Sequence, residues 1–150
     1  MIVESLQELF KRDLLKLKRE IELYSNEANL WKIDDTIQNS GGNLCLHLIG
    51  NLKTFIGNTL AGTDYVRDRT FEFSGKDVDR KELYKQLDET ILIVQKGLST
   101  VTTEQLKENF PIAIWEKETG LAFTLIHLHS HLNYHLGQVN YHRRLLDRSL

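Results

Sequence analysis

The chain contains one cysteine, Cys45, among its 150 residues, so no disulfide can form within it. Such sparse cysteine usage is typical of proteins from reducing compartments. No apolar run approaches the roughly 18 residues that a membrane span requires. The first ten residues include Glu4 and Glu8 and lack the basic and apolar regions of a signal peptide. We therefore expect a cytoplasmic protein that has no membrane partner.

The sequence also lacks a surplus of either charge. Nineteen basic residues face 21 acidic ones, for a formal net charge of −2. Proteins that bind nucleic acids usually carry a basic patch or tail, so we expect no nucleic-acid partner. A length of 150 residues suits one domain, and we expect residues 1–150 to form a single one.

Proline occurs once, at Pro111, and the rest of the chain is free to form long helices. Apolar residues recur every three or four positions in four segments, which predicts helices near residues 6–24, 44–60, 83–98 and 121–146. No segment shows a convincing strand pattern. We expect an all-α fold, a four-helix bundle with long connections after its second and third helices. Residues 62–76 have weak periodicity and are expected to form a connection without regular structure. Thr102 and Gln105 match a capping box that opens a short helical turn.

Histidines are concentrated in the last predicted helix, where four of the six fall between positions 127 and 135. His131 and His135 are four residues apart, so they share one face of the helix and can bind one metal ion. The zinc motif HExxH uses the same spacing. A third ligand is usual in such sites. His47 is expected on the inner face of the second helix, where apolar neighbours offer it little besides a metal.

Other polar residues lie near these three histidines. Gln138 and Asn51 are each about one turn from a ligand and are candidates to orient its imidazole. His127 lies one turn before His131, and either such a role or simple packing fits it. For His129, which lies some 160° around the helix from His127, we favour packing. His142, beside two arginines, is expected to be solvated at the helix end.

Two short sequences, LHLIGNL at 46–52 and HLNYHLGQ at 131–138, resemble the DinB/YfiT superfamily. Members of that family carry one histidine on the second helix and, on the fourth, HxxxH followed by Gly-Gln. The stretch RDRTFEF at 67–73 is similar to an uncharacterised branch of the same superfamily. Members often have a second histidine just before the last ligand and an arginine just after it. Tyr134 and Leu136 occupy those positions here.

The resemblance implies an up-down-down-up four-helix bundle, often a homodimer, with a divalent metal on His47, His131 and His135. Zinc and nickel are the metals that it implies. Some members are described as S-transferases that use a low-molecular-weight thiol, and others as metal-dependent hydrolases. Many have no known activity.

Three functions follow from these observations. The first is a metal-dependent S-transferase that adds a small thiol to an electrophile, because a metal-bound thiol loses its proton at neutral pH. Arg67 and Arg69 are candidates to bind the carboxylates of that thiol, although ion pairing with nearby acidic residues such as Glu72 is the more common role of surface arginines.

The second function is a metal-dependent hydrolase, which we rank lower because it usually requires a general base. The position after His131, where HExxH places its glutamate, is Leu132. Asp34, Asp35 and Glu118 are then the candidates for a base. The third is a non-enzymatic, metal-stabilised protein that acts in binding or in a stress response.

Overall fold

The computed structural model describes residues 1–148, and the all-helical fold class is confirmed. Within those residues the β structure is limited to one isolated bridge between Asn109 and Gly120. No described helix is both long and apolar enough to cross a membrane. The long helices are α1 (Ile2–Leu23), α2 (Gly41–Leu52), α4 (Arg80–Ser99) and α5 (Leu121–Leu146). The short ones are η1 (Glu27–Trp31), α3 (Arg69–Ser74) and η3 (Gln105–Lys107), and α2 continues into the π-helix η2 (Lys53–Ala61).

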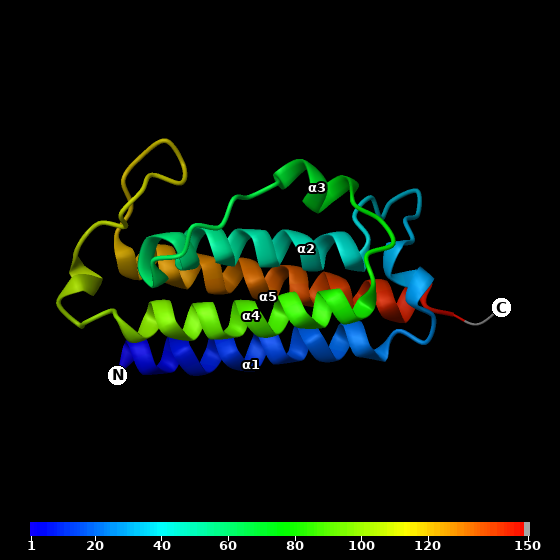
Figure 1. The fold of residues 1–150 in the computed structure, drawn as a ribbon, viewed down its shortest axis with the longest axis horizontal. Coiled ribbons are helices and arrows are strands. Elements are labelled where there is room, and N and C mark those ends of the chain that lie inside the picture. Colours follow the sequence, from blue (N-terminus) through cyan, green and yellow to red (C-terminus); the bar gives the residue numbers. More distant parts are fainter. Residues whose placement is uncertain (149–150) are drawn as a thin grey trace.

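The four long helices lie side by side, with α1 and α5 running in one direction and α2 and α4 in the other (Figure 1). α1 packs against α4 and α5, whereas α2 packs against α5 and α4, and its continuation η2 packs mainly on α4. α3 lies outside this group and covers α2 (Figure 1).

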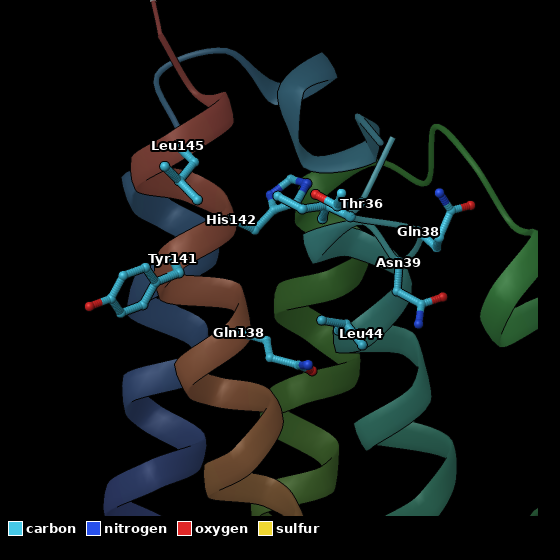
Figure 2. Close-up of a pocket in the computed structure, with 9 residues that line it drawn as sticks. Thr36, Gln38, Asn39, Leu44, Gln138, Tyr141, His142 and Leu145 are labelled. Carbon is cyan, nitrogen blue, oxygen red and sulfur yellow. The ribbon is translucent and has the colours of Figure 1, made fainter. Parts of the chain in front are cut away.

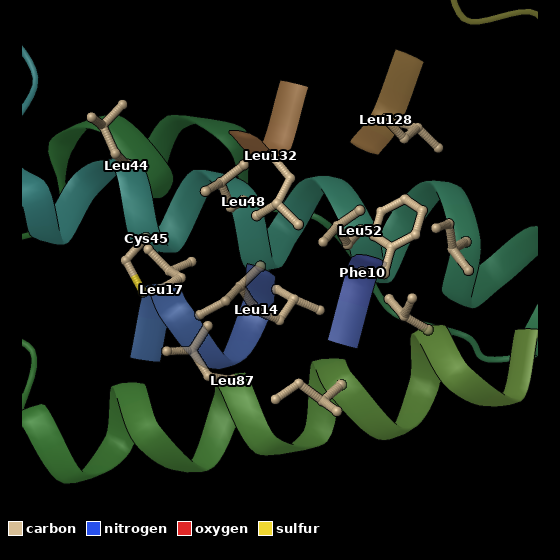
Figure 3. Packing of buried hydrophobic residues seen from close by; sticks show 14 of the residues in the cluster. Phe10, Leu14, Leu17, Leu44, Cys45, Leu48, Leu52, Leu87, Leu128 and Leu132 are labelled. Atoms are coloured by element: carbon tan, nitrogen blue, oxygen red, sulfur yellow. The ribbon is translucent and has the colours of Figure 1, made fainter. Parts of the chain in front are cut away.

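The core is built from the apolar stripes of these helices. Phe10, Leu14 and Leu17 of α1 are fully buried among leucines of α2, α4 and α5 (Figure 3). Burial of each such side chain stabilises the fold by roughly 1.5–3 kcal/mol relative to solvent exposure. The residues of α1 that follow the predicted spacing of three and four and are buried are Leu6, Phe10, Leu14, Leu17 and Ile21.

Helix ends follow the capping chemistry of the sequence. Thr102 Oγ1 accepts a hydrogen bond from the Gln105 backbone N–H, and the Gln105 side chain accepts one from the backbone N–H of Thr102, so the predicted capping box is confirmed. The predicted last helix agrees with α5 at both ends. The second helix starts three residues earlier than predicted, because Ser40 Oγ accepts a hydrogen bond from Asn43 N–H and so caps Gly41.

The prediction of an irregular connection at 62–76 was wrong over its second half, which forms α3. Asp68 caps this helix by accepting a hydrogen bond from the Phe71 backbone N–H. The side-chain Nδ2 of Asn43 on α2 donates to the backbone carbonyls of Glu72 and Gly75, at 3.0 and 2.8 Å. Six residues are too few for a helical period to show clearly, and these long-range hydrogen bonds help to hold the helix in place.

The expectation for His142 was also wrong, because its side chain is buried. Its Nε2 donates to the carbonyl of Lys32 at 2.8 Å, so its Nδ1 accepts from the Tyr24 hydroxyl at 2.7 Å. Burial lowers the pKa of this imidazole, which favours the neutral form that the two hydrogen bonds require. The segment after α1 folds back over the end of α5 and excludes water there, which helical periodicity cannot reveal.

A buried carboxylate joins α1 to α5. Asp13 is fully buried and accepts hydrogen bonds from Arg12 at 2.8 Å, His129 at 2.8 Å and Asn133 at 2.9 Å. Burial alone would raise the pKa of Asp13, but these donors outweigh it and lower the pKa to about 2. His129 therefore lies outside the histidine cluster, as we favoured, and its ring is held by a hydrogen bond to Asp13 as well as by packing against Phe10.

Replacing Asp13 by alanine should destabilise the protein by about 2–4 kcal/mol, because it removes the fully buried carboxylate that accepts hydrogen bonds from Arg12, from the half-buried His129 and from Asn133. Urea denaturation measures this loss. Asp88→Ala is the control, since the Lys18–Asp88 pair is solvent-accessible and exposed pairs contribute less than about 1 kcal/mol. Equal losses in the two variants would contradict the assigned role of Asp13.

Candidate metal centre

Three histidines from two helices converge on one point. The Nε2 atoms of His47 on α2 and His131 on α5 are 3.1 Å apart, and those of His131 and His135 are also 3.1 Å apart. One nitrogen from each of the three residues lies within 4.8 Å of the other two. His47 is buried and the other two are half-buried. The structure thus brings together the three residues predicted to be ligands.

Hydrogen bonds on the far side of two rings fix which nitrogen faces this point. His47 Nδ1 donates to the Glu72 carboxylate at 2.9 Å, and His135 Nδ1 donates to Gln138 Oε1 at 2.6 Å. A neutral imidazole carries one proton, so both Nε2 atoms then present lone pairs. The role predicted for Gln138, orienting a ligand, agrees with this contact.

The lone pairs of His47 and His135 both lie against His131 Nε2 and need a positive partner there. A neutral His131 can offer at most one N–H to its two neighbours, and its own Nδ1 is buried without a hydrogen-bond partner in the described chain. A metal ion bound to all three Nε2 atoms would satisfy them at once. In tetrahedral zinc sites with Zn–N distances of 2.0–2.1 Å, ligand nitrogens lie about 3.3 Å apart. The observed 3.1 Å separations fit such an ion.

The protonation states favour metal binding as well. Burial, and then the neighbouring His135 and His47, lower the pKa of His131 to about 4. Burial also lowers the pKa of His135. Both imidazoles are therefore neutral at pH 7, which is the form that binds a metal.

Glu72 is the residue of this site that the sequence did not reveal as a partner of His47. Its carboxylate is buried. It accepts hydrogen bonds from Arg67 Nε at 2.8 Å and from Arg67 Nη2 at 2.9 Å, in addition to the one from His47. Burial favours the protonated form of Glu72, but hydrogen bonds from His47 and Arg67 outweigh it and lower its pKa. Glu72 approaches α2 at Gly50, where a Cβ atom would lie 2.1 Å from its Oε2. The feature of the sequence that could have indicated this contact is Gly50, one turn after His47.

A cavity of about 370 Å³ opens on the three-histidine cluster. His47 and His131 of the cluster line it. The other lining residues come from α2 and η2, from α3 and the segment before it, and from α5 and the connection before it, namely Asn51, Phe55, Arg67, Arg69, Ile114, Trp115, His127 and Leu128. Trp115 and His127 form a T-shaped pair with ring centroids 4.5 Å apart. Both arginines predicted to bind substrate therefore face this cavity, and Arg67 also forms the ion pair with Glu72 that we considered as its alternative role.

Other candidates are placed differently. His127 stacks near His131, with centroids 6.4 Å apart, but no hydrogen bond links it to a ligand among the described contacts. Asn51 lines the cavity, and its Oδ1 has no hydrogen-bond partner in the described chain. Asp34, Asp35 and Glu118, the three candidates for a general base, are not among the residues that line the cavity.

A second cavity, of about 340 Å³, lies toward the other end of α5 (Figure 2). It is lined by Gln138, Tyr141, His142 and Leu145 of α5 and by residues 36–39 and Leu44. Gln138 thus borders this cavity while its Oε1 binds His135.

Comparison with known families identifies the family of this chain. The sequence model of a family described as "Protein of unknown function (DUF1572)" matches residues 2–149. The chain belongs to this family. Searches of curated proteins and of solved structures returned no significant match.

Purified wild-type protein should bind close to one zinc or nickel ion per chain, and His47→Ala and His131→Ala should each lose it. Mass spectrometry of the metal content after dialysis tests this. His127→Ala is the matched control, since it removes a histidine one turn from His131 that lies outside the cluster. Metal retained in His47→Ala would show that the two helices do not share a site.

Gly50→Ala and Glu72→Gln should each weaken metal binding by roughly tenfold to a hundredfold, the usual effect of losing a partner that orients a ligand. The added Cβ displaces the Glu72 carboxylate from His47. Competition with a coloured chelator gives the affinities. Gly137→Ala controls for helix propensity, because a Cβ there meets nothing within 4 Å. Equal affinities in Gly50→Ala and Gly137→Ala would rule out this role for Glu72.

Proposed function

We propose that the protein binds a divalent metal ion, zinc or nickel, through His47, His131 and His135, and that it is a metal-dependent S-transferase. The observation that carries the proposal is the convergence of three Nε2 atoms beside a cavity, with Nδ1 of His47 and of His135 already engaged. Three protein ligands leave a coordination position for a substrate, as in catalytic zinc sites.

The proposed reaction joins a low-molecular-weight thiol to an electrophilic carbon. A carbon–sulfur bond forms, the bond from that carbon to its leaving group breaks, and the leaving group departs with the electron pair. The thiol proton is released to solvent. When bound, the metal would supply the positive charge that keeps a coordinated thiol ionised at neutral pH.

The residues around the cavity support an anionic substrate. Arg67 and Arg69 contribute two positive charges to its lining. Among the described ion pairs, the carboxylate that pairs with these arginines is Glu72, which binds Arg67 and lies behind His47. No carboxylate lines the cavity within the described chain, so a general base for hydrolysis has no candidate of that type. Thiol transfer requires no such base, and we rank it first for this reason.

The relationship to DinB/YfiT proteins is part of the same proposal. The directions of α1, α2, α4 and α5 match the up-down-down-up order of that fold (Figure 1). We also propose a homodimer. Phe123, Tyr134 and Tyr141 form an exposed aromatic stripe along α5. Packing within the chain does not account for Gly137 on the same helix, since a Cβ there has open space.

Turnover of a thiol with monochlorobimane tests the activity. Because a free thiol of pKa about 8.5 is only about 3% ionised at pH 7, complete ionisation alone raises the rate about thirtyfold. Zinc- or nickel-loaded wild type should therefore exceed both metal-free protein and His131→Ala by up to about that factor for one thiol of a panel, since a thiolate of lowered pKa is also a weaker nucleophile. Metal-dependent hydrolysis of 4-nitrophenyl acetate without thiol would favour the hydrolase, and metal binding with neither activity would favour the non-enzymatic role.

A further inference from the structure

We propose that the π-helix η2 is a positioning device for the candidate metal centre, and that Asn58 is its central residue. In this assignment Asn58 holds segment 62–68 against η2. Arg67 of that segment is thereby held on Glu72, whose carboxylate orients the imidazole of His47. Asn58 is a positioning residue, since it contacts neither the ligands nor the cavity. The proposal rests on the proposed function only for the metal bound to His47, and it does not require that any reaction take place.

The length of η2 is the first observation. This π-helix of nine residues continues α2 directly and ends at Gly62, whose φ of +70° allows the chain to turn back. π-Helices have i→i+5 hydrogen bonds, are rare, and occur mostly as single turns, frequently at functional sites. Nine such residues directly after the helix that carries His47 indicate a role at that site.

Segment 62–68 returns along η2. It has no regular structure and runs from the end of η2 to α3 (Figure 1). Its burial alternates, because Thr63, Tyr65 and Arg67 are half-buried and the residues between them are exposed. A period of two is that of an extended chain with one face against a support. The support here is η2, since Thr63 N–H donates to the carbonyl of Gly57 at 3.2 Å.

Asn58 makes the central contacts to this segment. Its Nδ2 donates to the backbone carbonyl of Tyr65 at 2.8 Å. Its Oδ1 accepts from the Tyr65 backbone N–H and from the Thr63 hydroxyl, each at 2.9 Å. One side chain thus satisfies both backbone groups of Tyr65, as a neighbouring β-strand would. Without it, those groups have no other hydrogen bond among the described contacts.

Two cation–π contacts extend the support from η2 to Arg67. Lys53 Nζ lies 5.5 Å from the ring centroid of Tyr65, and Arg67 Cζ lies 5.7 Å from that of Phe55. Both distances are within the range of such contacts. Arg67 is therefore held between the ring of Phe55 and the carboxylate of Glu72, to which its Nε and Nη2 donate.

The position of Arg67 determines how Glu72 meets His47. Glu72 Oε1 accepts from His47 Nδ1 and from Arg67 Nη2, each at 2.9 Å, and Oε2 accepts from Arg67 Nε at 2.8 Å. This bidentate pair fixes the plane of the buried carboxylate. A carboxylate fixed in this way holds the proton of His47 on Nδ1 and leaves Nε2 free for a metal. A displaced Arg67 would loosen that arrangement.

Zinc affinity, measured by competition with a coloured chelator, tests the proposal. Asn58→Ala should weaken zinc binding roughly threefold to tenfold, the effect of losing hydrogen bonds that act through intervening residues. Thr63→Val removes one hydrogen bond of Asn58 and keeps the side-chain shape, so it should give a smaller loss in the same direction. Asn29→Ala is the matched control, because Asn29 Nδ2 donates to Asp147, beyond the end of α5, and its loss should leave zinc affinity unchanged.

A double-mutant cycle separates positioning from a general loss of stability. If Asn58 acts through Arg67, Asn58→Ala has no further effect on zinc affinity in an Arg67→Gln background. A purely structural role would give losses that multiply.

NMR of the metal-free protein tests the same link without zinc. The Arg67 Nε–H signal, identified by its absence in Arg67→Gln, should exchange with solvent faster in Asn58→Ala than in wild type and be unchanged in Asn29→Ala.

Failure of this proposal differs from failure of the proposed function. If zinc binds to wild type and to Asn58→Ala equally well, or if the losses in the cycle multiply, the positioning role is wrong and the metal site stands. If wild type binds neither zinc nor nickel, the proposed function fails. The exchange of Arg67 Nε–H then decides about Asn58 by itself, and equal exchange in wild type and Asn58→Ala would overturn its role.

Discussion

Every residue of α2 is buried, and this constraint organises the rest of the molecule. A helix buried on all sides must find a partner for each polar side chain that it carries, since an unpaired one costs roughly 1–3 kcal/mol. The partners come from its neighbours in space. Asn43 binds the backbone of α3, and His47 binds Glu72 of the same short helix. α3 thus completes the hydrogen bonding of α2 on one side, and α5 supplies the two other histidines on the opposite side.

The charges around the cluster favour an anionic ligand. An imidazole that binds a metal is neutral, so three such ligands contribute no charge, and the charges of the Glu72 and Arg67 pair cancel. A divalent cation would therefore leave the site strongly positive, with Arg69 adding to it. Such a site favours anionic ligands, whether a thiolate at the metal or a carboxylate at Arg69.

Helical periodicity predicted the long helices well. The prediction for α5 agreed at both ends, because its apolar residues recur every three or four positions over about seven turns and Gly120 precedes it. α3 was missed because six residues give too short a pattern and its stability depends on Asn43, 26 or more residues earlier. The burial of His142 was missed for a related reason. The segment that covers it follows α1 in sequence and returns to α5 only in the folded chain. No local pattern in the sequence indicates such long-range contacts.

The sequence by itself determined the helical class, the core stripe of α1 and the shared face of His131 and His135, because each depends on a period of three or four residues within one helix. It also pointed to His47 as a third ligand. Tertiary structure decided which groups surround these ligands. Glu72 reaches His47 because Gly50 leaves room for it, and Asn51 stays unpaired because no neighbour faces its oxygen. Contacts between helices depend on relative positions of a few ångströms, and no local pattern in the chain specifies them.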